Sequence, residues 1–146
     1  MTNVKKILAR KGREIWHINP DDTVYNAIKL MEDKEIGALV VLYAGTVIGI
    51  ISERDYARKV ILKSRSSKET KVKEIMTRQV YYTSPEQDIE ECLAVMTNRR
   101  VRHLPVIQNG KIVGMISIGD VVKEIISEQR FMIEQLEHTL SWEEAY

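Results

Sequence analysis

The chain has 146 residues, of which 44% are hydrophobic and 29% are charged, a composition that suits one soluble domain or two very small ones packed as a unit. Its 22 Lys and Arg against 21 Asp and Glu give a formal charge of +1. This balance argues against a nucleic-acid-binding or membrane-binding protein, because those classes carry a strong basic excess. A single cysteine, Cys92, excludes an intrachain disulfide and a cysteine-based zinc site, and the absence of an evident secretory leader predicts a cytoplasmic protein.

An internal repeat organises the chain. Residues 20–55 align without a gap on residues 85–120, an offset of 65 residues, and nine of the 36 aligned positions are identical. Most other positions exchange similar residues, as at Ile48 and Val113. A duplicated unit of this size cannot bury its apolar face alone, so the two copies are predicted to pack against each other.

The first copy predicts a helical start, a short strand, a helix, a hairpin and a second helix. In chain order these are residues 4–8, residues 16–18, a helix with Val24, Ala27, Ile28 and Met31 on one face, strands at 39–42 and 47–51, and a helix from about Asp55. The helical face follows from the i, i+3, i+4, i+7 spacing of its apolar residues, and the hairpin from two β-branched runs around a turn.

The second copy predicts the same elements again. They are residues 72–76, residues 80–83, a helix with Ile89, Cys92, Leu93 and Met96 on one face, strands at 104–107 and 112–116, and a helix from about Asp120. Asn109-Gly110 is a strong signal of a two-residue hairpin turn. The uncharged segment 36–52 approaches the ~20 residues of a membrane helix, but its copy contains Arg102 and Lys111, which a membrane span tolerates only at a high cost. Both segments are therefore predicted to be hairpins.

Each copy has the order β-α-β-β-α, with helices on one face of a small sheet, so the predicted fold class is α/β (α+β). We expect repeat 1 at residues 1–63, a polar linker at 64–71, repeat 2 at 72–126 and a C-terminal helical extension at 127–146.

The doubled pattern of a helix, an LPV-type strand, an Asn-Gly turn and a G-hydrophobic-hydrophobic-S-x-x-D segment resembles the CBS domain, named after cystathionine β-synthase. Two tandem repeats form a CBS pair, or Bateman module, and the resemblance covers about residues 4–126. Residues 51–60 and 135–138 also resemble a bacterial group of stand-alone CBS pairs that carry no catalytic domain. The resemblance implies two repeats packed sheet to sheet with pseudo-twofold symmetry, and a homodimer.

The same resemblance implies a regulatory function and no enzymatic activity. An adenosine ligand (AMP, ADP, ATP, S-adenosylmethionine or NAD(H)) would occupy clefts between the repeats, as a regulatory ligand and not as a catalytic cofactor. The bound ligand would bias the shape of the module, and a protein partner would read that change. The alternative function is a structural or protein-interaction module without a nucleotide.

Two serine–aspartate pairs stand where helices are predicted to begin: Ser52 with Asp55, and Ser117 with Asp120. Capping boxes alone would explain both pairs. A carboxylate also accepts hydrogen bonds from two vicinal hydroxyls, and a serine at a helix start suits a phosphate. In the CBS family the aspartate of this pattern holds ribose, so the resemblance implies ribose contacts at Asp55 and Asp120 and phosphate contacts at Ser52 and Ser117.

Arg102 and His103 stand at the entrance of a predicted strand, where the resemblance places ligand phosphates. A guanidinium offers a planar fork of donors to phosphate oxygens, and an imidazole adds a donor whose charge changes near neutral pH. The first repeat has Gly37 and Ala38 at the matching positions, whereas its Arg54 stands beside Asp55 as a further phosphate candidate. The two clefts are therefore predicted to be non-equivalent.

The base and strand-edge contacts implied by the resemblance fall on Ile18, Thr83, Gly37 and Ala38. Candidate apolar walls for adenine, or simply core residues, are Ile36, Ile50, Val101 and Met115. The three histidines lie far apart in the sequence without companion ligands, so no metal site is expected.

The C-terminal extension approximates a heptad pattern at Val122, Ile125/Ile126, Gln129, Met132/Ile133, Leu136 and Leu140. This pattern favours a dimer contact, and the alternative is a helix that lies on its own domain.

Overall fold

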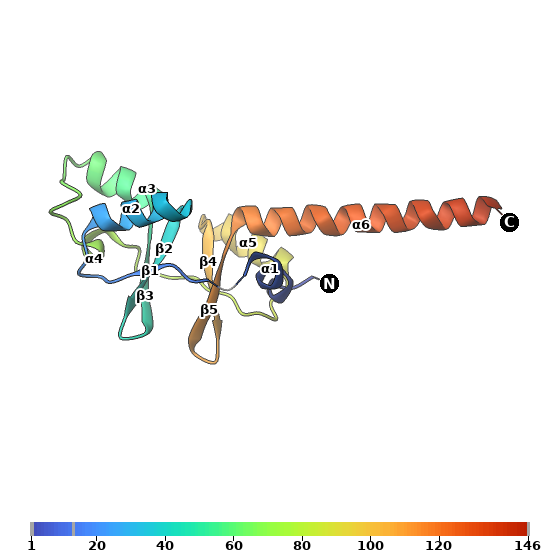
Figure 1. Ribbon diagram of the computed structural model, residues 1–146, viewed down its shortest axis with the longest axis horizontal. Helices are drawn as coiled ribbons and strands as arrows, with labels where there is room; N and C mark the ends of the chain where they lie inside the picture. The colour runs from blue at the N-terminus through green and yellow to red at the C-terminus, as the bar shows by residue number, and fades with distance from the viewer. Residues whose placement is uncertain (1, 13, 146) are drawn as a thin grey trace.

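The computed structural model describes residues 2–12 and 14–145, with side chains of the C-terminal helix described up to residue 138. Two repeats lie side by side, their hairpins point the same way, and a long C-terminal helix leaves the body at one end (Figure 1). The predicted mixture of helices and two small sheets is confirmed.

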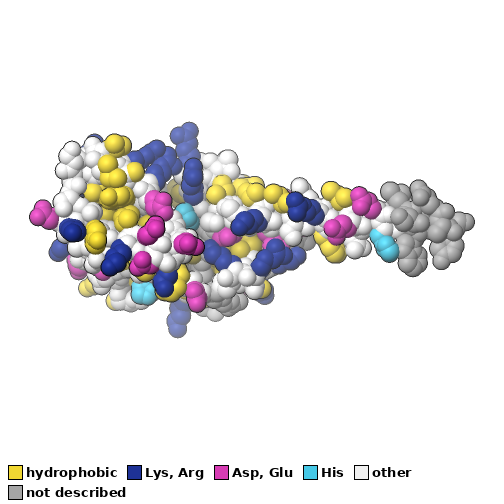
Figure 2. All heavy atoms as spheres, turned by 45° about the horizontal axis from the view of Figure 1, so that its top comes forward, with side chains coloured by type: hydrophobic (Ala, Val, Ile, Leu, Met, Phe, Trp, Pro, Cys, Tyr) yellow, Lys and Arg dark blue, Asp and Glu magenta, His cyan; other side chains and the backbone are white. Residues whose placement is uncertain are grey.

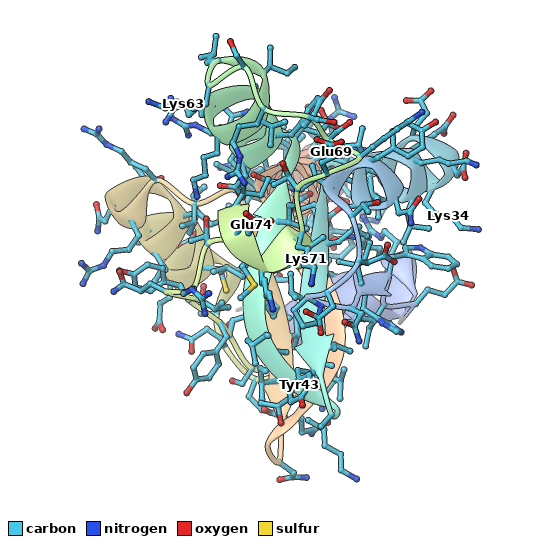
Figure 3. All side chains as sticks on the ribbon, turned by 90° about the vertical axis from the view of Figure 1, so that its left-hand side faces the viewer. Lys34, Tyr43, Lys63, Glu69, Lys71 and Glu74 are labelled. Atoms are coloured by element: carbon cyan, nitrogen blue, oxygen red, sulfur yellow. The ribbon has the colours of Figure 1, made fainter. Side chains whose placement is uncertain are left out.

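The first repeat forms a three-stranded sheet covered by helices. Its elements are β1 (His17–Ile18), α2 (Val24–Lys34), β2 (Ala38–Tyr43), β3 (Thr46–Ser52), α3 (Glu53–Tyr56) and the π-helix η1 (Ala57–Ile61). β1 pairs parallel with β2, and β2 pairs antiparallel with β3. The β2–β3 hairpin extends away from the helices, so that Tyr43 near its tip and Lys63 lie at opposite ends of the repeat (Figure 3).

The second repeat forms a two-stranded sheet. Its elements are α5 (Ile89–Arg99), β4 (His103–Gln108), β5 (Lys111–Ser117) and α6 (Ile118–Ala145). β4 and β5 are antiparallel, as β2 and β3 are. The strand predicted at residues 80–83 is reduced to one parallel bridge between Thr83 and Val106, because residues 79–81 leave the sheet and line a cleft.

Short-range signals fix where these elements begin and turn. The Thr23 hydroxyl accepts a hydrogen bond from the Asn26 amide (3.1 Å) at the start of α2, and the Asp88 carboxylate accepts one from the Glu90 amide (2.7 Å) at the start of α5. Both hairpins turn through two residues with positive φ, Ala44-Gly45 (52° and 80°) and Asn109-Gly110 (53° and 76°). The type I′ turn requires this left-handed backbone, which confirms the turn predicted at Asn109-Gly110.

Two short helices are exchanged between the repeats. α1 (Val4–Lys11) belongs to the core of the second repeat, and α4 (Val72–Ile75) belongs to the core of the first. Equivalent backbone bonds hold them: the Val4 amide donates to Gln87 O (3.0 Å), and the Val72 amide donates to Asp22 O (2.8 Å). The packing units therefore differ from the sequence segments 1–63 and 72–126, because each sheet is closed by the helix that precedes the other repeat.

Two separate apolar cores result from this exchange. The first contains Ile18, Val24, Ala27, Met31, Leu39, Val41, Ile51, Val60, Val72, Ile75 and Met76. The second contains Val4, Ile7, Leu8, Ile89, Cys92, Met96, Leu104, Val106, Ile116 and Val121. Predicted core residues of α2 and α5 occur at matching positions in the two sets, as the repeat implies.

α6 runs far beyond the second repeat (Figure 1). Its first turns pack on α5 and bury Val121, whereas Phe131, Met132, Ile133 and Leu136 are more than half exposed. Figure 2 shows hydrophobic side chains following the helix away from the body. Leu140, the last position of the predicted heptad, lies outside the described side chains. In the part of the chain that the structure describes, none of the helices has both the length and the apolar character to cross a bilayer.

Candidate functional site

A cleft of about 890 Å³ opens between the two repeats. Its walls come from the β3–α3 junction of the first repeat, the segment after α4, and the α5–β4 junction of the second repeat. It is lined by Gly37, Ile50, Ser52, Glu53, Arg54, Asp55, Arg58, Lys59, Thr77, Gln79, Val80, Tyr81, Arg99, Arg100, Val101, Arg102 and His103. We call it the Asp55 cleft.

A capping box at the start of α3 holds Asp55 in the wall of this cleft. The Asp55 amide donates to the Ser52 hydroxyl (3.2 Å), and Asp55 Oδ2 accepts from the Ser52 amide (3.0 Å) and the Ser52 hydroxyl (3.1 Å). The predicted capping box is thereby confirmed. Asp55 is buried, at 8% exposure, so its orientation is fixed by these bonds.

The second oxygen of Asp55 has two partners that the sequence reasoning missed. Oδ1 accepts a hydrogen bond from the Thr77 hydroxyl (3.2 Å) and pairs with Lys59 Nζ (3.1 Å). The same ammonium donates to Ile75 O (2.8 Å). The spacing of four residues between Asp55 and Lys59 was a signal for the ion pair, whereas the contact with Thr77 depends on the exchange of α4.

The lining of the cleft is strongly basic, with arginines from both repeats. Arg54 and Arg58 come from α3 and η1, and Arg99, Arg100 and Arg102 come from the end of α5 and the entrance to β4. Arg99 lies over the Tyr81 ring at 5.4 Å. Figure 2 shows Lys and Arg side chains projecting from the upper rim of the body near the junction of its two halves. As phosphate contacts, the sequence predicted Arg54 and Arg102 but not Arg58, Arg99 or Arg100.

His103 of the second repeat lies close to the first repeat. A Cβ atom at Gly37 would be 3.8 Å from both His103 Nε2 and Glu53 Oε1, so residues of the two repeats meet here. Burial lowers the pKa of His103, and the positive charges of Lys11 and Arg102 lower it further, although Asp120 acts in the opposite direction. This environment therefore favours the neutral imidazole.

Apolar side chains complete the Asp55 cleft. Ile50 of β3 and Val101 before β4, both predicted as adenine walls, line it together with Val80 and Tyr81. A cleft with an apolar wall, a carboxylate and a cluster of cations has the features that a flat, hydroxylated and anionic molecule requires.

The pseudo-symmetric site around Asp120 is occupied by a lysine of the chain itself. Asp120 Oδ2 accepts from the Ser117 amide (2.8 Å), and the Ser117 hydroxyl accepts from the Asp120 amide (3.1 Å). Lys11 Nζ, at the end of α1, donates to Asp120 Oδ2 (2.7 Å) and to Met115 O (3.0 Å). Partial burial would raise the pKa of Asp120, but the Lys11 ammonium and the Ser117 amide hold the pKa below its ordinary value.

The sequence profile of the CBS domain matches residues 4–62 and again residues 72–127. The chain belongs to the CBS domain family. It is 41% identical over 145 residues to the mitochondrial CBS domain-containing protein CBSX3 of Arabidopsis thaliana, covering 92% of this chain and 70% of that protein.

Solved CBS structures share the fold. A CBS-domain protein of Burkholderia ambifaria MC40-6, proposed to act in signal transduction, is 53% identical with a TM-score of 0.84, covering 88% of this chain and 96% of the other. A CBS pair solved in complex with 5′-methylthioadenosine and S-adenosyl-L-methionine is 22% identical with a TM-score of 0.78. The match covers 88% of this chain and 98% of the other. The chain is thus a tandem CBS pair.

Three residues predicted at the base or strand edge lie in the interior of the CBS repeats. Ile18 is part of the first core, Ala38 is 5% exposed, and the Thr83 hydroxyl is 3.3 Å from Cys92 Sγ. None of the three lines the Asp55 cleft, whereas Gly37 does. Ile18 also borders a separate open hollow of about 550 Å³ in the first repeat, beside Asp22 and Leu42.

Among the side chains of residues 2–12 and 14–138, no group of three His, Cys, Asp or Glu is arranged to hold a metal ion. The Cys92 thiol is buried, and burial raises its pKa, which disfavours the reactive thiolate.

Proposed function

We propose that this CBS pair is a regulatory, non-enzymatic module that binds an adenosine nucleotide in the Asp55 cleft. One observation carries the proposal: a fixed carboxylate from the first repeat faces arginine side chains and an apolar wall from the second across a single cleft. The CBS pair solved with 5′-methylthioadenosine and S-adenosyl-L-methionine supports it at the level of the fold.

Each part of a nucleotide has a matching part of the cleft. The adenine would lie against Ile50, Val101 and Tyr81, near the backbone of Gly37. The ribose hydroxyls would donate to Asp55 Oδ1 and replace the hydroxyl of Thr77 and the ammonium of Lys59 there. Lys59 would then turn toward the phosphates.

The phosphates would bind on the basic side of the cleft. Arg54 and Arg102 offer guanidinium donors from the two repeats, and His103 stands behind Arg102 at the β4 entrance. Ser52 keeps its hydroxyl on Asp55, so its contribution would be to hold that carboxylate in place beside the phosphates.

Signalling would follow from the position of the cleft. A nucleotide would join α3 of the first repeat to the α5–β4 junction of the second, so it would favour the arrangement of repeats in which both sets of contacts form. A protein partner that distinguishes the two arrangements would read the occupancy.

A second copy of the chain would cover the exposed part of α6. Met132, Ile133 and Leu136 are 58%, 54% and 64% exposed and continue the spacing of the buried residues of the same helix. Pairing this stripe with its own copy would remove it from water and give a homodimer. Removing the helix after residue 128 and measuring the molar mass by light scattering tests this: a dimer that persists would contradict it.

Titration calorimetry with AMP, ADP, ATP, NAD+, NADH and S-adenosylmethionine tests the nucleotide proposal. We expect at least one of them to bind with one molecule per chain, and Asp55→Asn to weaken this binding at least tenfold, because a neutral amide is a poorer acceptor for two hydroxyls. Asp120→Asn is the matched control, since it makes the same change in the other capping box, and it should leave the affinity within about twofold.

No binding by any of the six, or equal losses in both variants, would refute the nucleotide proposal. The first result would favour the alternative of a protein-interaction module without a nucleotide.

A further inference from the structure

The Asp55 cleft concentrates more positive charge than its own carboxylates balance. Six cationic side chains line it against two carboxylates, Glu53 and Asp55, in a protein whose formal net charge is only +1. Asp55 is already paired with Lys59. Within the described residues, Arg54, Arg58, Arg100 and Arg102 form no ion pair.

These arginines reach one place from different elements. Arg54 and Arg58 lie on successive turns of the α3–η1 helix, and the π-helical turn of η1 is a backbone irregularity often found at functional sites. Arg99 and Arg100 end α5, and the left-handed backbone of Arg100 (φ 55°) terminates the helix at the rim of the cleft. Packing of the two repeats therefore brings like charges together, which costs stability unless an anion binds.

A single phosphate does not use such a cluster. One phosphoryl group carries at most two negative charges. Arg54 from the first repeat and Arg102 from the second would balance them. Arg58, Arg99 and Arg100 also line the cleft, and all three residues are exposed to solvent. Linked phosphates that extend along the cleft from a ribose on Asp55 would bring negative charge to these three guanidinium groups.

We propose that the Asp55 cleft selects nucleotides with two or more linked phosphates, and that Arg58, Arg99 and Arg100 bind the outer phosphates. The inference rests on the proposed function and names its ligand class. It predicts that AMP, which ends at the first phosphate, and S-adenosylmethionine, which brings a cation into a basic cleft, bind more weakly than ADP and ATP.

Titration calorimetry with adenosine, AMP, ADP and ATP at physiological ionic strength, without magnesium so that the phosphates keep their full charge, tests the inference. We expect ATP to bind the wild type at least about tenfold more tightly than AMP. The triple variant Arg58→Gln/Arg99→Gln/Arg100→Gln should lose that preference and keep its AMP affinity within about threefold. The matched control, Lys5→Gln/Lys29→Gln/Arg130→Gln, removes the same charge from exposed positions outside the cleft and should keep the preference.

The outcomes separate the two proposals. Equal affinities for AMP and ATP, or a triple variant that still prefers ATP while thermal unfolding shows it folded, would overturn the polyphosphate inference and leave nucleotide binding intact. Failure of all four compounds to bind the wild type would instead refute the proposed function. Tripolyphosphate or a single-stranded oligonucleotide that binds more tightly than ATP would identify a general polyanion site and would also overturn the inference.

Discussion

The two repeats use the same residues to fold and different residues around their clefts. In both, a serine and an aspartate form the capping box after the hairpin, and in both, a lysine ammonium pairs with that aspartate, at 3.1 Å for Asp55 and 2.7 Å for Asp120. The lysines have different origins: Lys59 belongs to η1, which directly continues the helix α3 that carries Asp55, whereas Lys11 comes from the exchanged helix α1.

The lengths of the exchanged helices explain this difference. α4 ends at Ile75, so the chain after it is extended and Thr77 pairs with the backbone of Ile50 in β3. α1 continues to Lys11. The Lys11 ammonium donates to Met115 O, the carbonyl that corresponds to that of Ile50, and to the Asp120 carboxylate. Nucleotide binding at Asp120 would therefore require Lys11 to leave.

The charged residues near the two aspartates differ still more between the repeats. Where the Asp55 cleft has Arg102 and His103, the matching positions of the first repeat are Gly37 and Ala38, and Gly119 matches Arg54. A duplication preserves what each sheet needs in order to fold, namely its apolar positions, caps and turns. It leaves the rims of the clefts free to diverge, because exposed charges contribute little to folding.

The largest expected difference in stability between the repeats concerns Gly49 and Gly114, the glycines against which the exchanged segments pack. A Cβ at Gly49 would lie 2.7 Å from Met76 Sδ and 3.0 Å from the backbone oxygen of Thr77, whereas one at Gly114 would meet only the end of the Leu8 side chain, at 2.6 Å. Gly49→Ala should lower the free energy of unfolding by about 1–3 kcal/mol, and Gly114→Ala by less, because a side chain can turn away and a backbone oxygen cannot. Urea unfolding measures both. An equal or larger loss in Gly114→Ala would show that the repeats accept their helices in the same way.

The hairpin turns offer a smaller contrast. Ala44 and Asn109 both have φ near 53°, but asparagine tolerates the left-handed conformation better than alanine. Ala44→Asn should raise the free energy of unfolding by about 1 kcal/mol, and Asn109→Ala should lower it by a similar amount. Thermal unfolding of the two variants and of the double exchange measures this. A destabilising Ala44→Asn would mean that the first hairpin depends on a contact of Ala44 and not on its backbone.

The ion pair between Lys11 and Asp120 predicts that the second repeat contributes to the acid response of the protein. Because the folded-state pKa of Asp120 is lowered from 3.8, its contribution to stability is present above that value and is lost as the pH falls through the folded-state pKa. Lys11→Met raises this pKa, so the loss should begin at a higher pH. Unfolding between about pH 6 and pH 3 measures the effect, with Lys5→Met on the exposed side of α1 as control. Identical profiles for the two variants would dismiss the role of Lys11.

The smallest expected effect concerns His103, which lines the Asp55 cleft and whose pKa also responds to Asp120. Its folded-state pKa is lowered from 6.5, so folding opposes its protonation, and stability from this group is lost as the pH falls below 6.5. A bound phosphate would favour the imidazolium, and ATP binding should then take up a proton and strengthen modestly from about pH 8 to pH 6. His103→Gln should remove that part of the pH dependence, while protonation of ATP itself remains common to both proteins. Calorimetry in buffers of different ionisation enthalpy measures the proton uptake, and equal uptake by both proteins would exclude His103.

The sequence correctly predicted the elements whose stabilising contacts join residues close together in the chain. The helical faces of α2 and α5, both hairpins, the Asn109-Gly110 turn and the Ser52–Asp55 capping box all follow from spacing along the chain, because their stabilising contacts lie within a few residues. The short strand expected at residues 80–83 was wrong in extent, since β propensity does not show that Val80 and Tyr81 are needed to line a cleft.

By itself, then, the sequence determined the duplicated unit, its periodicity and its turns, all of which express local backbone preference and apolar spacing. Only the tertiary structure decided that α1 and α4 change places, that Thr77 and Lys59 meet Asp55 while Lys11 meets Asp120, and that Arg58, Arg99 and Arg100 share one cleft. The physical reason is that these contacts join residues distant in the chain, whose proximity depends on how two separately formed cores pack and not on any pattern within either repeat.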